Sequence, residues 1–497
     1  LGRVYAPPLG AALLTALLWL LHRPAPCPAC IPDWGIQPER FRSWAGGLLA
    51  CCLAAWAQHA AASGYHFGTQ SVTAQSTANS STAEAADAST LFYNPAGLTN
   101  LETHQISGAV NLVMPHIDYS EGKASYIGTN TAVSGKTSGT ITDSVVPAPH
   151  VYGAYKLNDR VTLGLGVYVP FGSSTEYDRD SVLRYNMNQL GLTTIAVEPV
   201  VAFKATEEHS FGAGLIAQHS SAELRKYADF GRAAGRPGQA DGYAKVKGSD
   251  WGYGYHLGWL WNVNDRVRVG VNYRSKVSHN LSGTANWSFD NSNPSSLFNT
   301  PMGAPLQQSI RNNGYAASEN ASVKIVTPES LSLHGMFRAN SKLNLFGDIT
   351  WTRHSRFNRA ELLFQNTKQL GGGRTSNRTV LTPNWRNTFK VGLGASYQYN
   401  DQLQLRGGVA FDQSPVRNAT YRLNTLPDGN RIWFSVGAKY AFNQHHSIDV
   451  AYSHIHINDT VVRSASADGT TVDSKGASSA RFKNYANILG VQYNYKF

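Results

Sequence analysis

The chain has 497 residues, of which 15% are charged and 11% aromatic, and its formal net charge is +11. A mean hydropathy of −0.29 is too polar for a bundle of membrane helices. The longest apolar run, over residues 10–21, is shorter than the ~20 residues that a membrane-spanning helix needs. Lys and Arg are scattered rather than clustered, which argues against nucleic acid as a partner.

The N-terminal region has the order of an export signal. A basic cluster at residues 40–42 precedes an apolar stretch over 44–56, and small residues follow at 60–62. We therefore expect residues 1–62 to be an N-terminal extension and signal peptide that is removed. Residues 1–39 do not fit a signal peptide, and they are interpreted either as an over-extended upstream start or as a genuine extra anchor.

From Gln105 to Phe497, short segments alternate apolar and polar residues. The breaks between them are alternately very short, as at 158–160, and long and rich in Gly, Ser, Asn and Thr. This rhythm predicts an all-β fold, a transmembrane antiparallel β-barrel of about 14 strands over residues 105–497 with long extracellular loops. The strands are expected to be centred near residues 111, 151, 166, 199, 216, 257, 272, 333, 348, 392, 408, 437, 452 and 491.

The C-terminal segment has the clearest alternation. One of its faces carries Leu489, Val491, Tyr493, Tyr495 and Phe497. A terminal strand with outward aromatic residues is expected to close the barrel against the first strand and to lie at the interfacial aromatic girdle. It also resembles the assembly signal of outer-membrane barrels, so the barrel assembly machinery is an expected partner through Phe497.

Long loops are expected between alternate strands. The one at 284–326 carries Phe298, Met302 and Leu306 at roughly helical spacing. An exposed apolar helix here would hold a hydrophobic ligand at the cell surface, or these side chains would pack the loop onto its neighbours. The expected loops cover residues 120–145, 173–190, 228–247, 284–326, 356–383, 417–430 and 461–483.

Residues 63–104 break the strand rhythm. They are small and polar, and they are numerous enough to form a plug inside the barrel. Three motifs occur here: Gly64-Tyr65 after the signal, Ala86-Asp87-Ala88-Ser89, and Asn94-Pro95-Ala96-Gly97. Together with Tyr168-Val169-Pro170-Phe171-Gly172, they resemble the N-terminal hatch and the third strand of the FadL-type long-chain fatty acid transport protein family of Gram-negative outer membranes.

The resemblance implies a monomeric barrel whose lumen is plugged by a hatch at residues 63–104. A hydrophobic compound, most simply a long-chain fatty acid, would be captured between outer loops and would reach an internal apolar pocket beside Tyr65 and Phe67. It would leave sideways into outer-membrane lipid, inside the lipopolysaccharide layer, at a distorted third strand. Aromatic or other hydrocarbons are the alternative cargo, and a general diffusion porin is the alternative function.

The local chemistry of the third strand fits an interruption. Pro170 has no N–H to donate to the ladder, and Gly172 follows closely. A lateral opening at Pro170, Phe171 and Gly172 would let an apolar molecule reach the bilayer. The alternative is that these residues only end the strand.

A fatty acid carboxylate needs a cation or several donors. The inward-facing candidates could instead pair with acidic lumen residues such as Asp348 or Asp412. These candidates are Arg266, Arg268, Arg274, Arg406 and Lys439.

The sequence offers little for metal or catalytic chemistry. Cys27-Pro-Ala-Cys30 has redox or metal spacing but lacks a second ligand pair, and His454-x-His456 lacks a third ligand nearby. No Ser or His lies in a recognisable nucleophile motif. We therefore expect no cofactor, no bound metal and no enzyme activity.

Overall fold

The structure is a computed structural model that describes residues 68–370 and 373–497. The expected signal region, Tyr65 and Phe67 lie outside these residues. Among the helices of the described residues, none is long and apolar enough to cross a bilayer.

The described residues form short helices and twenty strand segments. The helices are α3 (Val72–Gln75), η1 (Thr82–Glu84), α4 (Thr90–Tyr93), η2 (Pro95–Asn100), η3 (Gly231–Ala234), η4 (Leu297–Asn299), α5 (Gly303–Asn312) and η5 (His354–Arg356). The first ten strands are β1 (Gln105–Tyr126), β2 (Gly139–Asp143), β3 (Val146–Lys156), β4 (Val161–Tyr168), β5 (Gly172–Glu176), β6 (Met187–Lys204), β7 (His209–Asp229), β8 (Asp241–Asn262), β9 (Val267–Arg274) and β10 (Val277–Phe289). The others are β11 (Glu319–Thr327), β12 (Ser330–Arg338), β13 (Leu343–Thr352), β14 (Ala360–Gln369), β15 (Thr375–Leu381), β16 (Thr388–Gln398), β17 (Leu403–Asp412), β18 (Arg431–Ala441), β19 (His446–Ser464) and β20 (Lys475–Lys496).

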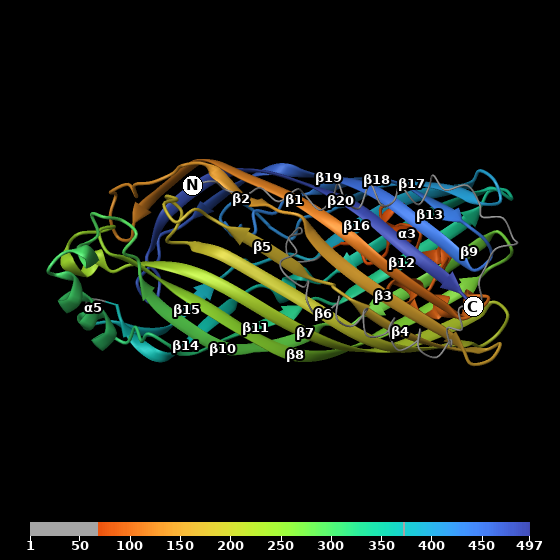
Figure 1. The fold of residues 1–497 in the computed structure, drawn as a ribbon, viewed down its shortest axis with the longest axis horizontal. Helices are drawn as coiled ribbons and strands as arrows, with labels where there is room; N and C mark the ends of the chain where they lie inside the picture. The colour runs from red at the N-terminus through yellow and green to blue at the C-terminus, as the bar shows by residue number, and fades with distance from the viewer. Residues whose placement is uncertain (1–67, 371–372) are drawn as a thin grey trace, which may run out of the picture. The chain divides into compact units, whose positions relative to one another are not determined.

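The twenty segments build a closed antiparallel barrel of 14 strands (Figure 1). There are more strand segments than barrel strands because some barrel strands are interrupted along their length. For example, β4 and β5 belong to one barrel strand and pair with successive parts of β6. The terminal strand β20 pairs with β1 from Gln105↔Lys496 to Tyr126↔Lys475 and closes the wall. The predicted fold class is confirmed, and each predicted strand centre falls inside a strand.

The period-two pattern separates a lipid face from a lumen face. On β17, Leu405, Val409 and Phe411 are 43%, 48% and 47% exposed, whereas the intervening Arg406 is 6% exposed. On β20, Leu489 and Val491 are likewise exposed. Outward apolar and inward polar residues are what a membrane barrel with a polar interior requires.

The wall extends beyond the predicted strands at the loop end. Strands β14 and β15 lie inside the expected loop 356–383, and β2 lies inside the expected loop 120–145. Strand β5 begins at Gly172 and runs into the expected loop 173–190. The loop prediction was wrong at these places. Above the bilayer the outward face need not be apolar, so the alternating signal fades while the backbone pairing continues.

The described residues before β1 lie inside the barrel, in the half that holds the C-terminus (Figure 1). We call residues 68–104 the hatch segment. Helix α3 contacts β18, β19, β20 and β1, whereas η2 contacts β4, β6, β7 and β8. Glycines in the wall make room for it, because a Cβ at Gly408 would lie 2.3 Å from the carbonyl carbon of Thr77.

Candidate functional site

The Asn94-Pro95-Ala96-Gly97 motif anchors the hatch segment to the wall. The Asn94 side chain accepts a hydrogen bond from the Ala96 amide and donates one to the carbonyl of Trp259 on β8, each at 3.0 Å. Pro95 opens η2, where a missing N–H costs nothing. Gly97 packs closely, since a Cβ there would meet the Thr90 hydroxyl at 2.3 Å.

Two of the predicted carboxylate-binding arginines hold the hatch segment. Arg268 donates to the carbonyls of Ala83 (3.1 Å) and Glu84 (2.9 Å). Arg406 donates to the carbonyl of Thr73 and lies 3.4 Å from the Glu84 carboxylate. Arg266 is exposed beside a short turn. None of these arginines lines the chambers described below.

The third crossing of the barrel is interrupted between Tyr168 and Gly172. Pro170 and Phe171 lie in the break, and the Val169 carbonyl accepts a hydrogen bond from Gln70 of the hatch segment at 2.8 Å. The interruption is therefore in direct contact with the hatch segment.

The facing edge of the second crossing is also unpaired. On β3, residues 146–149 pair with β1 but not with β4, and the register with β4 starts at Val151↔Val167. This stretch contains Pro147 and Pro149, which cannot donate to a neighbouring strand. Sequence reasoning missed these residues, although two prolines at alternate positions of a strand are a usable sign of an open edge.

A buried ionic cluster joins the interruption to the hatch segment. The Glu198 carboxylate is fully buried, accepts hydrogen bonds from Tyr168 and Arg274, and lies 2.5 Å from His256 Nδ1. Arg274 also donates to the carbonyl of Phe92 at 3.0 Å. The Arg274 charge is thus already compensated, and the guanidinium ties the hatch segment to the end of β4.

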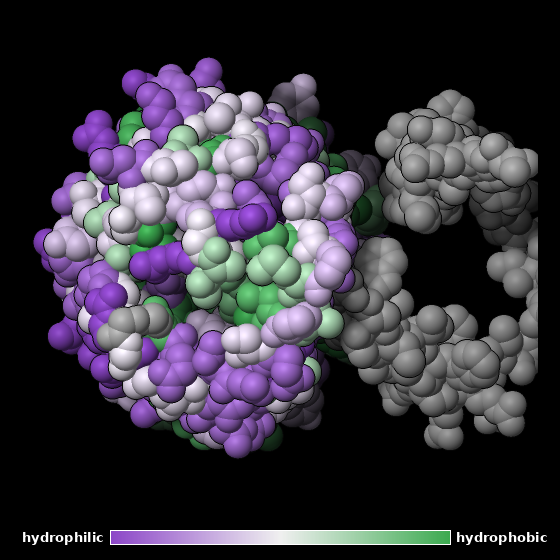
Figure 2. Space-filling view, turned by 90° about the vertical axis from the view of Figure 1, so that its left-hand side faces the viewer, coloured by the Kyte–Doolittle hydropathy of each residue, from purple (hydrophilic) through white to green (hydrophobic). Residues whose placement is uncertain are grey.

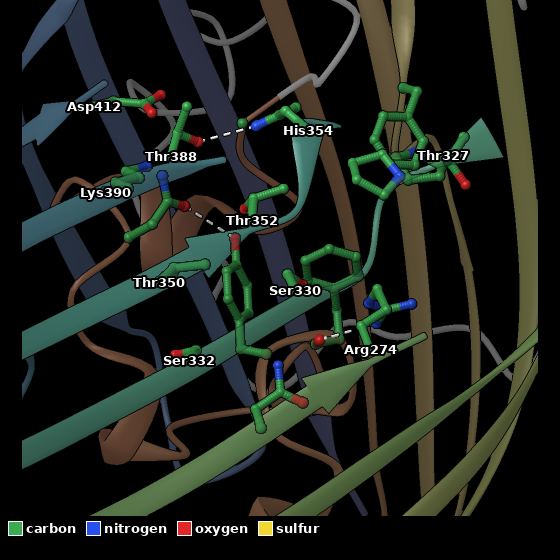
Figure 3. A pocket seen from close by; sticks show the side chains of 18 of the residues that line it. Arg274, Thr327, Ser330, Ser332, Thr350, Thr352, His354, Thr388, Lys390 and Asp412 are labelled. Atoms are coloured by element: carbon green, nitrogen blue, oxygen red, sulfur yellow. Dashed lines mark hydrogen bonds between the residues drawn. The ribbon is translucent and has the colours of Figure 1, made fainter. Parts of the chain in front are cut away.

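A polar chamber lies between the hatch segment and the interrupted crossing (Figure 3). Its volume is about 140 Å³. Hydroxyls and charged groups from β12, β13 and β16 point into it, and Pro170 and Phe171 form part of its wall. Its lining includes Asn79, Phe92, Pro170, Phe171, Arg274, Ser330, Ser332, Asp348, Thr350, Thr352, His354, Lys390, Asp412 and Arg431.

Lys390 is a cation of this chamber whose side-chain nitrogen lies over an aromatic ring. Arg431 bonds Asp412 at 2.6 Å, and the Asp348 carboxylate accepts from Ser332 at 2.8 Å and Thr350 at 2.7 Å. The Lys390 ammonium lies 4.3 Å from the Trp433 ring centroid. Within the described part of the chain it has no hydrogen-bond or ion-pair partner.

An apolar chamber of about 90 Å³ adjoins the polar one, and both are lined by Thr327. Among the described residues, no charged side chain lines it. Ser173, just after the interruption, also forms part of its wall. Its apolar side chains include Met187, Leu190, Leu192, Leu224, Leu281, Val323, Ile325, Phe357, Leu381, Leu423 and Leu426.

The apolar residues of the 284–326 loop lie outside the polar and the apolar chamber. Phe298 is buried, with its ring 4.9 Å from that of Phe289, and Leu306 packs against the same cluster. Met302 is 53% exposed. These three residues line neither chamber. Phe298 and Leu306 pack onto neighbouring strands and loops, as in the second of the two interpretations, whereas Met302 does not.

A closed barrel with an apolar outer band, an internal segment and chambers in its lumen defines the class of outer-membrane transport barrels. A family model described as outer membrane protein transport protein (OMPP1/FadL/TodX) matches residues 53–497. The chain belongs to this family of outer-membrane transporters of hydrophobic compounds, which is not an enzyme family.

Several relatives share most of the chain. A putative outer membrane protein of Neisseria meningitidis serogroup B is 60% identical over 467 residues, covering 90% of this chain and 97% of the relative. The long-chain fatty acid transport protein of Escherichia coli (strain K12) is 25% identical over 439 residues, covering 83% and 89%.

Solved structures share the fold. A Pseudomonas aeruginosa FadL homologue superposes with a TM-score of 0.77 at 23% identity, covering 87% of this chain and 100% of the homologue. The Pseudomonas putida toluene transporter TodX superposes with a TM-score of 0.60 at 17% identity, covering 88% and 99%.

Proposed function

We propose that this protein takes up long-chain fatty acids across the outer membrane by diffusion. The observation that carries the proposal is the Lys390 side chain, which has no hydrogen-bonded carboxylate among the described residues and lies in a chamber that adjoins an apolar one. A fatty acid has both matching parts, a carboxylate and a long chain. An uncharged aromatic hydrocarbon, the kind of cargo that the name of TodX indicates for that protein, would offer the Lys390 side chain no hydrogen-bond acceptor.

The polar chamber holds a cation and several hydroxyl donors, which are the groups that a carboxylate needs for binding. Lys390 supplies the cation, and the hydroxyls of Thr352 and Ser330 line the same space (Figure 3). Such charge-assisted bonds are roughly twice as strong as neutral ones. The hydrocarbon chain would extend past Thr327 into the apolar chamber.

Release into the membrane would occur at the interrupted crossing. Val169, Pro170 and Phe171 interrupt one edge, and Gly172, which was also expected in the opening, is instead the first residue of β5 and pairs with Thr193. The unpaired part of β3 forms the other edge. The proposed hatch, residues 63–104, would block water flow through the lumen, so the cargo leaves sideways. Ligand contacts by Tyr65 and Phe67, assembly through Phe497 and a monomeric state remain predictions.

The test is uptake by a Gram-negative host that lacks its own long-chain fatty acid transporter. Cells that express this chain are expected to take up radiolabelled oleate well above cells with an empty vector, and toluene no faster than those cells. Toluene uptake without oleate uptake would instead identify an aromatic hydrocarbon transporter. A large steady conductance in planar bilayers would identify a diffusion porin.

A further inference from the structure

The outward apolar face of the wall ends at a definite row of residues on β9, β12, β13 and β16. Leu331 pairs with both Tyr273 and Trp351, and Trp351 pairs with Phe389, so the four side chains share one face of the sheet. Leu331 and Phe389 are 43% and 52% exposed, which identifies this face as the outward one. Aromatic residues here are typical of the girdle between hydrocarbon and lipid headgroups. We call these four residues the border row.

The wall between the border row and the loop end is polar. Strands β10, β11, β14 and β15 continue it side by side in the half of the barrel that carries α5 (Figure 1). Figure 2 shows hydrophilic residues around much of the rim at that end, with hydrophobic residues nearer its middle. This part of the wall therefore lies at the height of the headgroups or above it. The exposed side chains of β10 are all polar: Ser278, Asn280, Ser282, Thr284 and Asn286.

Cationic side chains gather on this polar wall just beyond the border row. Four are arginines whose side chains are between 30% and 55% exposed, and two are exposed lysines. They come from neighbouring parts of the wall: the β9–β10 junction, β11, the segment between β13 and β14, and β15. We call them the basic patch: Lys276, Lys324, Arg353, Arg356, Arg359 and Arg378.

Two of these arginines share one carboxylate, that of Glu329. Glu329 lies two residues before Leu331, and Arg353 lies two residues after Trp351, so both continue the outward face of the border row. The guanidinium groups of Arg353 and Arg356 lie 3.2 Å and 2.7 Å from the Glu329 carboxylate. A single carboxylate can neutralise only one of these two charges.

The other carboxylate of the patch, that of Glu361, is shared in the same way. Arg359 lies 2.6 Å from it and Arg378 lies 3.6 Å from it. Lys324 follows the last pair between β11 and β14 and so lies beside Glu361 on the sheet. Within residues 68–370 and 373–497, Lys276 and Lys324 form no ion pair. Six cationic side chains thus share two carboxylates.

We propose that the basic patch binds the phosphate groups of lipid A, the membrane anchor of lipopolysaccharide, in the outer leaflet. Lipid A carries its phosphates where its sugars meet its acyl chains, which is the height of the patch beside the border row. The phosphates supply the negative charge that two carboxylates leave missing, and the planar guanidinium of arginine binds phosphate oxygens in pairs. The acyl chains lie along Leu331 and Phe389. The site is independent of the cargo that the barrel transports.

The basic patch also spans the least connected part of this wall. The barrel strands are interrupted here between β9 and β10, between β11 and β12, and between β13 and β14. Pairing between β11 and β14 covers only Ala321↔Phe364 to Val323↔Leu362. A lipid whose phosphates contact several of these segments binds the folded barrel and not the unfolded chain, so it raises the Tm.

The test is binding of lipid A by the purified full-length protein in a nonionic detergent. The probes are bisphosphorylated lipid A, dephosphorylated lipid A and phosphatidylglycerol. The variant Lys324→Gln/Arg359→Gln/Arg378→Gln changes three exposed positions and leaves the Glu329 pairs intact. It is expected to bind bisphosphorylated lipid A about tenfold more weakly than wild type, because three exposed charge pairs are lost. The dephosphorylated form should bind more weakly and equally to both proteins.

The matched control is Arg160→Gln/Arg266→Gln/Lys342→Gln, which removes the same charge at exposed positions beside short turns. It should bind lipid A as wild type does. Heat-modifiable migration on gels verifies that each variant is folded and gives its Tm, which lipid A should raise less in the patch variant than in the control.

Three outcomes would overturn the site. Unchanged binding of lipid A by the patch variant would show that these cations do not contact the phosphates. Equal weakening in the control would show that net charge, rather than the patch, attracts the lipid. Equally tight binding of phosphatidylglycerol would show that the patch does not select lipid A.

Discussion

The two inner chambers differ in what they can discriminate. The apolar chamber is lined by aliphatic side chains such as Leu224 and Leu281, so we expect it to accept any hydrocarbon of suitable width. The polar chamber contains Lys390, several hydroxyls and the hydrogen-bonded carboxylates of Asp348 and Asp412, so we expect it to distinguish a charged cargo from a neutral one. Affinity is therefore expected to come mainly from the first chamber and selectivity from the second.

The largest effect is expected from a charge inside the apolar chamber. Leu224→Asp places a carboxylate where nothing can pair with it, and burying an unpaired charge costs at least several kcal/mol. Uptake of oleate and binding of oleyl alcohol should both fall to background, measured in cells and with purified protein. Leu224→Met, which keeps volume and polarity, should retain both. If Leu224→Asp reduced only the binding and uptake of oleate, the apolar chamber would not be the main source of affinity for both ligands.

A smaller and selective effect is expected in the polar chamber. Lys390→Met should lower oleate affinity by about tenfold, since a hydrogen bond to a charged group contributes about 1.5–3 kcal/mol. Oleyl alcohol, which lacks the charge, should bind as before. Lys276→Met, at an exposed position, is the control. An equal loss for acid and alcohol would show that Lys390 supports the fold rather than the headgroup.

Loss of the contact between the hatch segment and the interruption is expected to reduce oleate uptake less than the changes in the two chambers do. Gln70→Ala removes the bond to the Val169 carbonyl, and one such bond contributes about 1 kcal/mol, or roughly fivefold in rate. Oleate uptake should fall by up to that factor. Gln75 is an equally buried glutamine of the hatch segment that donates to the Ile488 carbonyl, far from the interruption. Uptake by Gln75→Ala cells should stay near wild type; equal losses would indicate a general loosening.

The smallest effect on uptake is expected from the wall behind the hatch segment. A Cβ at Gly408 would overlap the backbone of Thr77, and overpacking of this kind costs about 1–3 kcal/mol. Gly408→Ala should raise single-channel conductance in planar bilayers and leave oleate affinity nearly unchanged. Gly108→Ala meets nothing within 4 Å and serves as the control. Equal conductance in the two variants would contradict a sealing role for this contact.

The sequence was sufficient for the membrane part of the wall. Outward residues such as Leu405 and Val409 must be apolar, so alternation locates these strands and their lipid face. The strands at the loop end, such as β14 and β15, carry no such requirement, and they were predicted as loops. The Asn94-Pro95-Ala96-Gly97 motif was recognisable because a turn and a close approach need particular residues.

The chambers could not be read from the sequence. Lys390 and Arg268 both alternate as inward polar residues, but one faces an open chamber and the other bonds to the hatch segment. The distinction depends on the height of each residue along the barrel and on what lies opposite, which register and hatch position decide. Similarly, Leu224 and Leu423 are far apart in sequence, and only the closed wall brings them together.

The unpaired edge of β3 affects whether neighbouring barrels associate through strand pairing in a crowded membrane. An open strand edge normally invites a strand from another molecule, which leads to aggregation. Pro147 and Pro149 lower the number of donors on that edge, so it is a poor template for such pairing. They also remove two N–H groups that lipid could not satisfy. The interruption at which we propose that cargo leaves is therefore expected to resist strand pairing between neighbouring barrels.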